Sequence, residues 1–406
     1  MRCDTRRLAA SDYESAFIET CKQLQALSIA DNLGSAALVI PMLPTSPSLA
    51  NEKFFTQYDR MATNPKTRLI DVAKDAGVSP ATVSRAISQP LLLASETLAR
   101  VRASAQKLGY RPDAAARALA SGRSQTIGAV MPTLDNAIFS RALQAMQTVL
   151  ATEGYQLLVA SHNYSAAAEA DAIRTLLASG VDGLVLVGAE RAPEADAAIA
   201  DGGVPVVLAW RARPGFAAVT VDNERAGRLA ARHLVQLGHR SIGVVTGLHS
   251  FNDRQRARLA GARAYLDEVG ISLPDWLAVQ QPTTLAGGRA GCATLLALAE
   301  PPTAIIGGID LIAIGCIIEA QSRGFDVPGN ISVVGIDDLD MSAHLSPPLT
   351  TVHVPTARIG AESALKLLGL IQNRDMATTR ELPVDLVIRR SSGAAPIAPS
   401  RGGRSS

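Results

Sequence analysis

Apolar positions follow two different patterns along the chain, one before residue 110 and one after residue 125. Between residues 67 and 110 they recur every three or four positions, which predicts short amphipathic helices. From Thr126 onward, short β-branched runs alternate with amphipathic stretches, which predicts strands alternating with helices. A chain of 406 residues is long enough for two or three domains of these kinds.

The second pattern predicts an α/β fold with doubly wound parallel sheets. Seven short apolar runs are bounded by Gly, Pro or polar residues, and we expect each to be a strand: TIGAVMP, YQLLVAS, DGLVLVG, PVVLAW, SIGVVTG, TAIIGG and ISVVGID. The amphipathic stretches between them predict helices at 166–179, 224–237, 256–269 and 311–323. Alternating strands and helices form parallel sheets covered on both faces. Roughly 265 residues exceed one compact sheet, so we expect two similar lobes with a cleft between them.

The first pattern begins with a tight helical pair. Ile70 and Ala73 mark the expected inner face of a first short helix, and Gly77 permits a sharp turn after it. Ser79 is a favourable N-cap for the next helix, and Pro80 suits the first helical position.

The second and third helices complete a three-helix unit. Val83, Ala86 and Ile87 share one face of the second helix, which turns Pro80, Ala81, Ser84 and Arg85 outward. Ser95 is expected to cap a third helix that ends at Gly109. The apolar stripe of that helix comprises Leu98, Val101, Ala105 and Leu108.

Charge distinguishes this unit from the rest of the chain. Residues 66–123 hold ten bases and four acids, a net charge of +6, whereas the whole chain carries only +2. A basic three-helix unit with a tight second turn is typical of a helix-turn-helix that inserts its second helix into the major groove of DNA. Arg85 suits a guanine edge, and Thr82, Ser84 and the amides near Ser79 suit phosphates. The alternative, a helical hairpin packed on the body, does not explain the small, polar and basic outer face.

Specific motifs then resemble the lactose/galactose-repressor (LacI–GalR) family of transcriptional regulators. They are LIDVAKDAGVSPATVSRAIS, LGYRPDAAARALASGRSQTIGAV, HLVQLGHRSIGVVTG, ARLAGARAYL, ISVVGIDD and PPLTTVHVP, and they extend over residues 67–390. The resemblance implies a two-lobed effector domain of the type I periplasmic-binding-protein kind, a palindromic DNA operator, and a homodimer. It adds Thr67 to the residues expected to contact DNA.

In that family the segment RPDAAARALAS is a hinge that folds into a short helix when two subunits meet on the operator. The resemblance places Leu119 where a leucine wedges into the central base step through the minor groove, with Ala116 and Arg117 as neighbouring contacts. Such a wedge costs a few kcal/mol of unstacking, which contacts on the bent duplex offset.

The resemblance also implies an effector site between the two lobes. Arg258 matches an arginine that grips effector hydroxyls or a carboxylate, and Asp337 matches an acid that accepts hydrogen bonds from them. Either could instead belong to a structural ion pair. Phe139 matches an aromatic residue that lines the cleft, and Asn136 lies near it in the sequence.

Three positions depart from the family pattern. Ile309 replaces a common asparagine, Trp210 replaces a frequent acid, and Pro282 replaces an aromatic residue that stacks on the ligand. Trp210 and Ile309 therefore make the expected cleft less polar. Since the motif MPTLDNAIFSRAL is most similar to the gluconate-type repressors, we expect a sugar or sugar acid as effector rather than a nucleoside.

The predicted organisation has five parts. They are an N-terminal extension at 1–60, the helix-turn-helix at 66–110, the hinge and linker at 111–124, the effector and dimerisation domain at 125–392, and a disordered tail at 393–406. Met61 is a natural start before the first ordered helix, so we expect residues 1–60 to be a loosely ordered arm or a mis-assigned extension rather than a functional N-terminal domain.

The sequence favours a regulator over an enzyme or a solute receptor. It contains no GxGxxG after the first strand and no GxxxxGK[ST], HExxH or GxSxG, and its six histidines are scattered, as expected of surface or turn residues. The four cysteines lack metal spacing, and no secretory signal or membrane-spanning run is present. We therefore expect no catalytic residues, metal or cofactor, and a cytoplasmic location, whereas a receptor would need an export signal and would not explain the helix-turn-helix.

Overall fold

The computed structural model describes residues 67–111, 122–374 and 378–396. Three sequence predictions lie outside the described residues: the extension at 1–60, the hinge contacts Ala116, Arg117 and Leu119, and the final residues 397–406 of the tail. The described residues form two folded parts, a helical unit before residue 112 and a body after residue 121.

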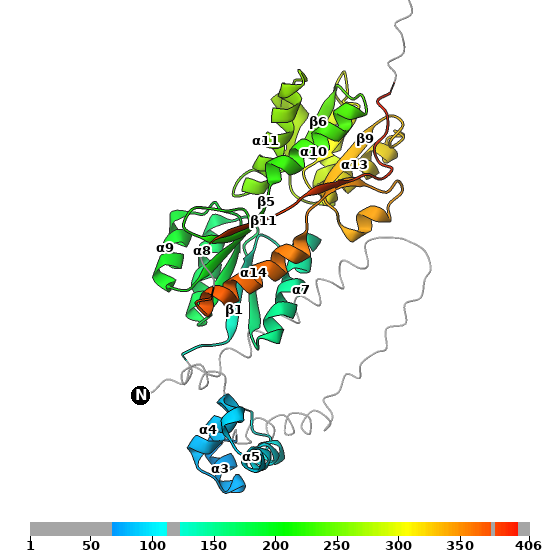
Figure 1. The fold of residues 1–406 in the computed structure, drawn as a ribbon. Coiled ribbons are helices and arrows are strands. Elements are labelled where there is room, and N and C mark those ends of the chain that lie inside the picture. Colours follow the sequence, from blue (N-terminus) through cyan, green and yellow to red (C-terminus); the bar gives the residue numbers. More distant parts are fainter. Residues whose placement is uncertain (1–66, 112–121, 375–377, 397–406) are drawn as a thin grey trace, which may run out of the picture. The chain divides into compact units, whose positions relative to one another are not determined.

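The helical unit is a small bundle of three α-helices and one 3-10 turn (Figure 1). Its elements are α3 (Leu69–Ala76), α4 (Pro80–Ser88), η1 (Pro90–Leu92) and α5 (Ser95–Lys107). Val72, Val83 and Val101, one from each α-helix, are almost completely buried together. Gly77 has a φ of 64° in the turn between α3 and α4, a conformation that favours glycine. The sequence thus predicted the three helices and most of their inner faces correctly.

Two details of the predicted bundle are wrong. Ile70 is 49 % exposed, because the buried positions of α3 are Val72, Ala73 and Ala76. Ser95 does not cap α5, since it is the first helical residue, and the N-cap Ala94 makes no side-chain capping bond. Both errors are small displacements of the helical register, and the faces of α4 and α5 are as predicted.

The first lobe of the body is a six-stranded sheet with the order β11-β5-β4-β3-β1-β2. All of its strand pairs are parallel. The strands are β1 (Thr126–Met131), β2 (Gln156–Ser161), β3 (Gly183–Val187), β4 (Val206–Trp210), β5 (Ala217–Val221) and β11 (Thr379–Leu382). Helices α7 (Ala137–Thr152) and α14 (Thr356–Ile371) pack together on one face, and α8 (Ala166–Ala178) and α9 (Pro193–Gly202) pack on the other (Figure 1).

The second lobe repeats this plan with the order β12-β10-β9-β8-β6-β7. Its strands are β6 (Ile242–Gly247), β7 (Ala278–Gln281), β8 (Ala304–Gly307), β9 (Ser332–Asp337), β10 (Thr350–His353) and β12 (Asp385–Val387). Only β12 runs antiparallel among these described strands. Helices α10 (Asn223–Gln236) and α11 (Asp253–Glu268) pair with each other, as do α12 (Leu285–Leu296) and α13 (Asp310–Ser322). Two short 3-10 turns, η2 (Asp275–Leu277) and η3 (Asp340–Ala343), complete the lobe.

The chain passes between the lobes three times. It crosses from β5 to α10, returns from β10 to α14, and crosses again from β11 to β12. All seven predicted strands and all four predicted helices are present, which confirms the two-lobed α/β fold. In such sheets ligands bind at the carboxyl ends of the parallel strands, so we expect a binding site at the loops after β1–β4 and β6–β9.

The last described segment is not a free tail. Ser391, Gly393 and Ala395 hydrogen-bond to the second lobe, and Gly393 N donates to Ser332 Oγ at 3.0 Å. The expectation of disorder from residue 393 is therefore wrong for these residues.

Three histidines, predicted to be surface or turn residues, are buried; His162 and His239 lie in loops, whereas His233 lies on α10, where the prediction is wrong. His239 hydrogen-bonds to Thr303 and to the Gly393 carbonyl oxygen, so it fixes the C-terminal segment. Burial lowers the pKa of His233 and of His239, so both imidazoles are neutral at physiological pH.

No helix among the described residues is long and apolar enough to cross a bilayer.

Candidate functional site

The outer face of α4 carries the residues that the sequence assigned to DNA. Pro80, Ala81, Ser84 and Arg85 are exposed, and Thr82 is half-buried. Ser79 caps the helix as predicted, because its Oγ accepts a hydrogen bond from Thr82 N at 3.1 Å. The Ser79 and Thr82 hydroxyl groups also share a hydrogen bond of 2.9 Å.

Helix α4 packs on α3 and α5, and polar contacts join these two helices to each other. Ser104 on α5 donates to Asp75 at 2.8 Å, and Lys107 donates to the same carboxylate at 2.7 Å. These bonds hold the pKa of Asp75 below its usual range, with Lys107 contributing most. Thr67 is half-buried at the start of the described segment. The helix-turn-helix thus presents a compact exposed face on a braced scaffold.

Arg258 and Asp337 meet at the inner edge of the second lobe, as the resemblance implied. Arg258 lies on α11 and Asp337 ends β9; both are buried, and Arg258 Nη2 lies 3.0 Å from Asp337 Oδ1. Arg258 also donates to Asn223 Oδ1 at 3.1 Å and to the Gly308 carbonyl at 2.8 Å. The guanidinium therefore holds together the ends of two strands and the first residue of α10.

The electrostatics of Asp337 are unusual for a carboxylate. Burial raises its pKa to about 7, and the positive charge of Arg258 opposes that shift. Among the described residues, neither Asp337 oxygen accepts a hydrogen bond with good geometry, although Arg258 lies within ion-pair distance. The contact with Arg258 therefore leaves lone pairs of the Asp337 carboxylate for another donor. Asp337 has a φ of 133°, outside the range usual for non-glycine residues, as often seen at functional sites.

The first lobe contributes an aromatic corner to the same region. Phe139 and Trp210 pack edge to face with their ring centroids 5.4 Å apart, and both are buried. Trp210 ends β4 with a φ of 67°, and its carbonyl accepts a hydrogen bond from Asn223 Nδ2 at 3.1 Å. Asn136 is buried and caps α7 through a bond to Ile138 N. Hydrogen bonds thus connect Trp210 in the first lobe to Arg258 in the second through Asn223.

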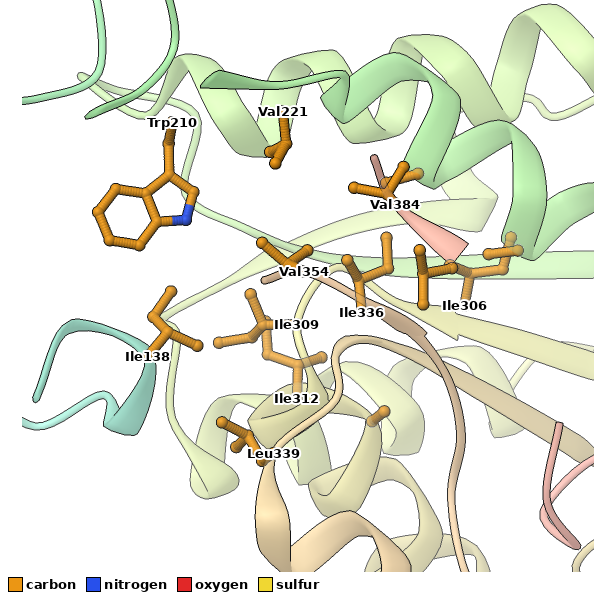
Figure 2. Packing of buried hydrophobic residues seen from close by; sticks show 14 of the residues in the cluster. Ile138, Trp210, Val221, Ile306, Ile309, Ile312, Ile336, Leu339, Val354 and Val384 are labelled. Carbon is orange, nitrogen blue, oxygen red and sulfur yellow. The ribbon is translucent and has the colours of Figure 1, made fainter. Parts of the chain in front are cut away.

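An apolar cluster fills the space beside this connection. Ile309 is buried and belongs to the same cluster as Ile138 and Trp210 (Figure 2). The adjacent Asp310 is fully buried and accepts hydrogen bonds from Leu339 N, Ser342 Oγ and Thr351 Oγ1. Ile309, at the position where an asparagine was expected, therefore packs in the apolar cluster and presents no polar group.

An open cavity of about 340 Å³ lies at the mouth of this region. Its lining comes from the loops after β1, β2, β6 and β7: Thr133, Asp135, Asn136, Asn163, Tyr164, Leu248, Ser250, Asn252, Pro282, Thr283 and Thr284. Asn136 is the only predicted ligand residue in this lining, and Pro282 is the position where a stacking residue was expected. Arg258, Asp337, Phe139, Trp210 and Ile309 are buried and absent from the lining.

Sequence reasoning missed a second charged group at the same edge of the lobes. His162, Glu169, Arg191, Asp253 and Arg254 are brought together from the loops after β2 and β3, from α8 and from the start of α11. The signal for one member was available, because Arg254 precedes Arg258 by one helical turn. Nothing in the sequence indicated that Arg191 would meet it.

Comparisons with known proteins agree with this geometry. Residues 68–113 match the model of the bacterial regulatory proteins of the lacI family, and residues 231–392 match that of the periplasmic binding protein-like domain. The transcriptional repressor PurR of Pectobacterium carotovorum is 33 % identical over 80 % of this chain and 97 % of its own. The regulator GntR of Pseudomonas aeruginosa is 33 % identical over 81 % of this chain and 97 % of its own.

A solved structure gives the same result for the fold. The Lac repressor dimer bound to operator and the anti-inducer ONPF superposes with a TM-score of 0.74 at 30 % identity, covering 81 % of this chain and all of that one. The exposed face of α4, the two lobes and the extent of these matches lead to one conclusion: the chain belongs to the LacI family of bacterial transcriptional regulators.

Proposed function

We propose that this regulator is a repressor that binds a palindromic operator as a homodimer. A carbohydrate effector held between its two lobes would control its affinity for the operator. The observation that carries the proposal is the buried hydrogen-bonded connection between the lobes. Asp337 contacts Arg258, Arg258 donates to Asn223, and Asn223 donates to the Trp210 carbonyl. A ligand that contacts Asp337 or Arg258 would therefore bias how the lobes meet.

The DNA contacts that we propose follow the faces of α4. Arg85 would contact a guanine edge in the major groove, where a good bidentate contact is worth roughly 1–3 kcal/mol of discrimination. Ser79, Thr82 and Ser84, with Thr67 at the edge of the unit, would contact phosphates, and Pro80 and Ala81 would lie against the groove. The hinge contacts Ala116, Arg117 and Leu119 stay predictions, because they lie outside the described residues.

The effector contacts that we propose combine hydroxyl and apolar recognition. Asp337 keeps free lone pairs for hydroxyl donors, and Arg258 supplies a buried charge beside it. Asn136, Phe139, Trp210 and Ile309 would form the first-lobe and apolar walls. This mixture suits a sugar or sugar acid, which presents hydroxyl groups at its edges and C–H groups on its faces.

The finer assignments also belong to the proposal. We infer a regulator without catalytic activity, located in the cytoplasm, where its operator would be. We also retain the division into a helix-turn-helix at 66–110, a hinge and linker at 111–124, and an effector and dimerisation domain from 125. The hydrogen bonds of Gly393 and Ala395 extend the last domain slightly beyond residue 392.

A titration of operator binding against salt, with and without ligand, tests the proposal. Operator affinity should fall steeply as salt rises, because phosphate contacts release counterions. A sugar that shifts the thermal unfolding of the protein should change operator affinity, and Arg258→Ala should abolish that change while operator binding persists. A flat salt response would refute the DNA-binding surface, and a ligand response that survives Arg258→Ala would refute this placement of the cleft.

A further inference from the structure

Five buried titratable side chains lie where the first lobe meets the start of α11. His162 and Arg191 follow β2 and β3, and Glu169 lies in the first turn of α8, all in the first lobe. Asp253 and Arg254 open α11 in the second lobe. Arg191 Nε lies 3.4 Å from Glu169 Oε1, and Arg254 Nη1 lies 3.1 Å from Asp253 Oδ1.

Several nitrogen atoms in this group have no acceptor. Among the described residues, Arg191 Nε, Arg254 Nη2 and His162 Nδ1 are buried without a hydrogen-bond partner. Burial, with the charges of Arg254 and Arg191, lowers the pKa of His162 to about 4, so its imidazole is neutral. Buried donors without acceptors are destabilising, so a ligand that carries oxygen lone pairs would stabilise these N–H groups.

The group forms only where the two lobes touch. Asp253 Oδ2 accepts a hydrogen bond of 2.7 Å from Ala189 N, and Arg256 pairs with Glu190. A Cβ atom at Gly188 would lie 2.8 Å from Arg254 Nη1, and Gly188 has a φ of 84°. The loop after β3 therefore lies directly against the first turn of α11. A ligand that contacts Arg254 and Arg191 together would bridge the lobes.

The spacing on α11 relates this group to the proposed effector cleft. Arg254 and Arg258 are four residues apart, so their side chains lie on one face of the helix, with Cβ atoms about 6 Å apart. Both are buried. Arg254 also helps to lower the pKa of Asp337, which places its charge within electrostatic range of that carboxylate. A molecule the length of a five- or six-carbon sugar could contact both arginines.

We propose that Arg254 and Arg191 form an anion subsite that receives a carboxylate of the effector. The proposal rests on the effector cleft described above and narrows its ligand to acids that also carry hydroxyl groups. Arg254 Nη2 makes no hydrogen bond, and Arg191 Nε makes none although it lies 3.4 Å from Glu169, so each guanidinium keeps an N–H that a carboxylate oxygen could accept. Asp253 and Glu169 already lie in the group, and a doubly charged phosphate would meet stronger repulsion from them than a singly charged carboxylate.

Calorimetric titration of the full-length protein with matched ligands tests this subsite. The panel contains five- and six-carbon aldonates and uronates, the neutral aldose of each, and the corresponding sugar phosphates. The acids should bind at least about tenfold more tightly than their neutral counterparts. Arg254→Gln and Arg191→Gln should each remove most of the advantage that the acids have over their neutral counterparts.

The control variant is Arg263→Gln on the same helix, whose side chain is 37 % exposed and pairs with Asp275. It should leave the advantage of the acids intact. Arg254→Lys retains the charge but not the forked geometry, so it should weaken acid binding less than Arg254→Gln, and it provides a test if the glutamine variant does not fold.

Three other outcomes of the titrations would contradict the anion subsite, the choice of a carboxylate, or the carbohydrate effector. Equal binding of acids and neutral sugars, or acid binding unchanged in Arg254→Gln and Arg254→Lys, would overturn the anion subsite and leave the effector cleft in place. Tightest binding by the sugar phosphates would overturn the choice of a carboxylate. If no member of the panel binds while operator binding persists, the carbohydrate effector itself is refuted.

Discussion

The proposed DNA-binding face and the proposed effector cleft of this regulator are built in opposite ways. The face of α4 uses residues within one helix, and its functional side chains are mostly exposed. The cleft uses Asn223, Arg258 and Asp337 from separate elements, and all three are buried. A surface that contacts a partner from outside needs only a braced helix, whereas a site that encloses its ligand depends on how distant elements pack.

The difference has an energetic consequence. A substitution on the exposed face of α4 removes a contact to DNA but leaves no buried charge behind. A substitution in the cleft leaves a charged or polar partner without compensation in a dry environment, which is far more costly. We therefore expect substitutions in the proposed cleft to lower the free energy of unfolding more than substitutions on the exposed face of α4.

Arg258→Ala should have the largest effect on stability. It leaves the buried Asp337 carboxylate without its counter-charge and removes the donors to Asn223 and to the Gly308 carbonyl. Removing one partner of a buried ion pair costs about 3–5 kcal/mol in free energy of unfolding. Denaturant unfolding of the body, followed by circular dichroism, measures this loss.

The double variant Arg258→Met with Asp337→Leu is the matched control. It removes both charges together, so it should be less destabilising than either single change. Additive losses from the two single changes would show that the pair is not coupled in the folded protein.

The contribution of Asp337 to the free energy of unfolding should fall as pH rises from about 4 to about 7. The pKa of Asp337 is raised to about 7 in the folded chain, against about 3.9 for an unfolded aspartate. Over this range the folded state holds a proton that the unfolded state has released, so the folded state loses relative stability with rising pH, and the loss is complete above pH 7. This one group would contribute a few kcal/mol.

Asp337→Asn isolates that contribution, because asparagine does not titrate. The difference in unfolding free energy between wild type and Asp337→Asn should change between pH 4 and pH 7 and then stay constant. Parallel stability curves across this range would contradict the raised pKa. Arg258 lacks its carboxylate partner in the variant at every pH, which changes the stability by a constant amount. The test is therefore how the stability difference depends on pH, and not how large that difference is.

The two regions also differ in how far the sequence predicted them. The helical period placed Val83 and Ala86 inside α4 and Pro80 and Arg85 outside it, and the structure agrees. Local rules suffice there because α4 is supported by neighbours in sequence. The error at Ile70 lies in a helix of eight residues, where the period has little length to act on, and the error at Ser95 is a shift of one residue at the start of α5.

Cleft residues were predicted only where a motif carried them. Arg258 and Asp337 came from the family resemblance, and the structure brings them within 3.0 Å. Arg191 and Arg254 carry no local signal, because their meeting depends on the loop after β3 touching the start of α11. The burial of His239 was missed for the same reason, because it depends on packing against the C-terminal segment, which is distant in sequence.

Arg85→Ala should weaken specific DNA binding with little effect on folding. Loss of a guanine contact costs roughly 1–3 kcal/mol, and the side chain is exposed in the free protein. Band-shift titrations with operator and with a scrambled duplex should therefore show a reduced ratio of the two affinities. Arg102→Ala, at an exposed position of α5, is the control and should change both affinities by a similar factor. An unchanged ratio for Arg85→Ala would remove this residue from the base-contacting set.

Ser79→Ala should have a small effect on folding and a larger one on DNA binding. The Ser79 hydroxyl accepts a hydrogen bond from Thr82 N, and its loss as an N-cap costs about 1 kcal/mol of stability in the helical unit. Because α4 begins at this cap, fraying of its first turn would displace Pro80 and Ala81, which lie on the proposed groove face. Ser79→Asp restores a capping oxygen but places a negative charge near phosphates. It should therefore recover stability without recovering operator affinity, and recovery of both would show that Ser79 serves only to start the helix.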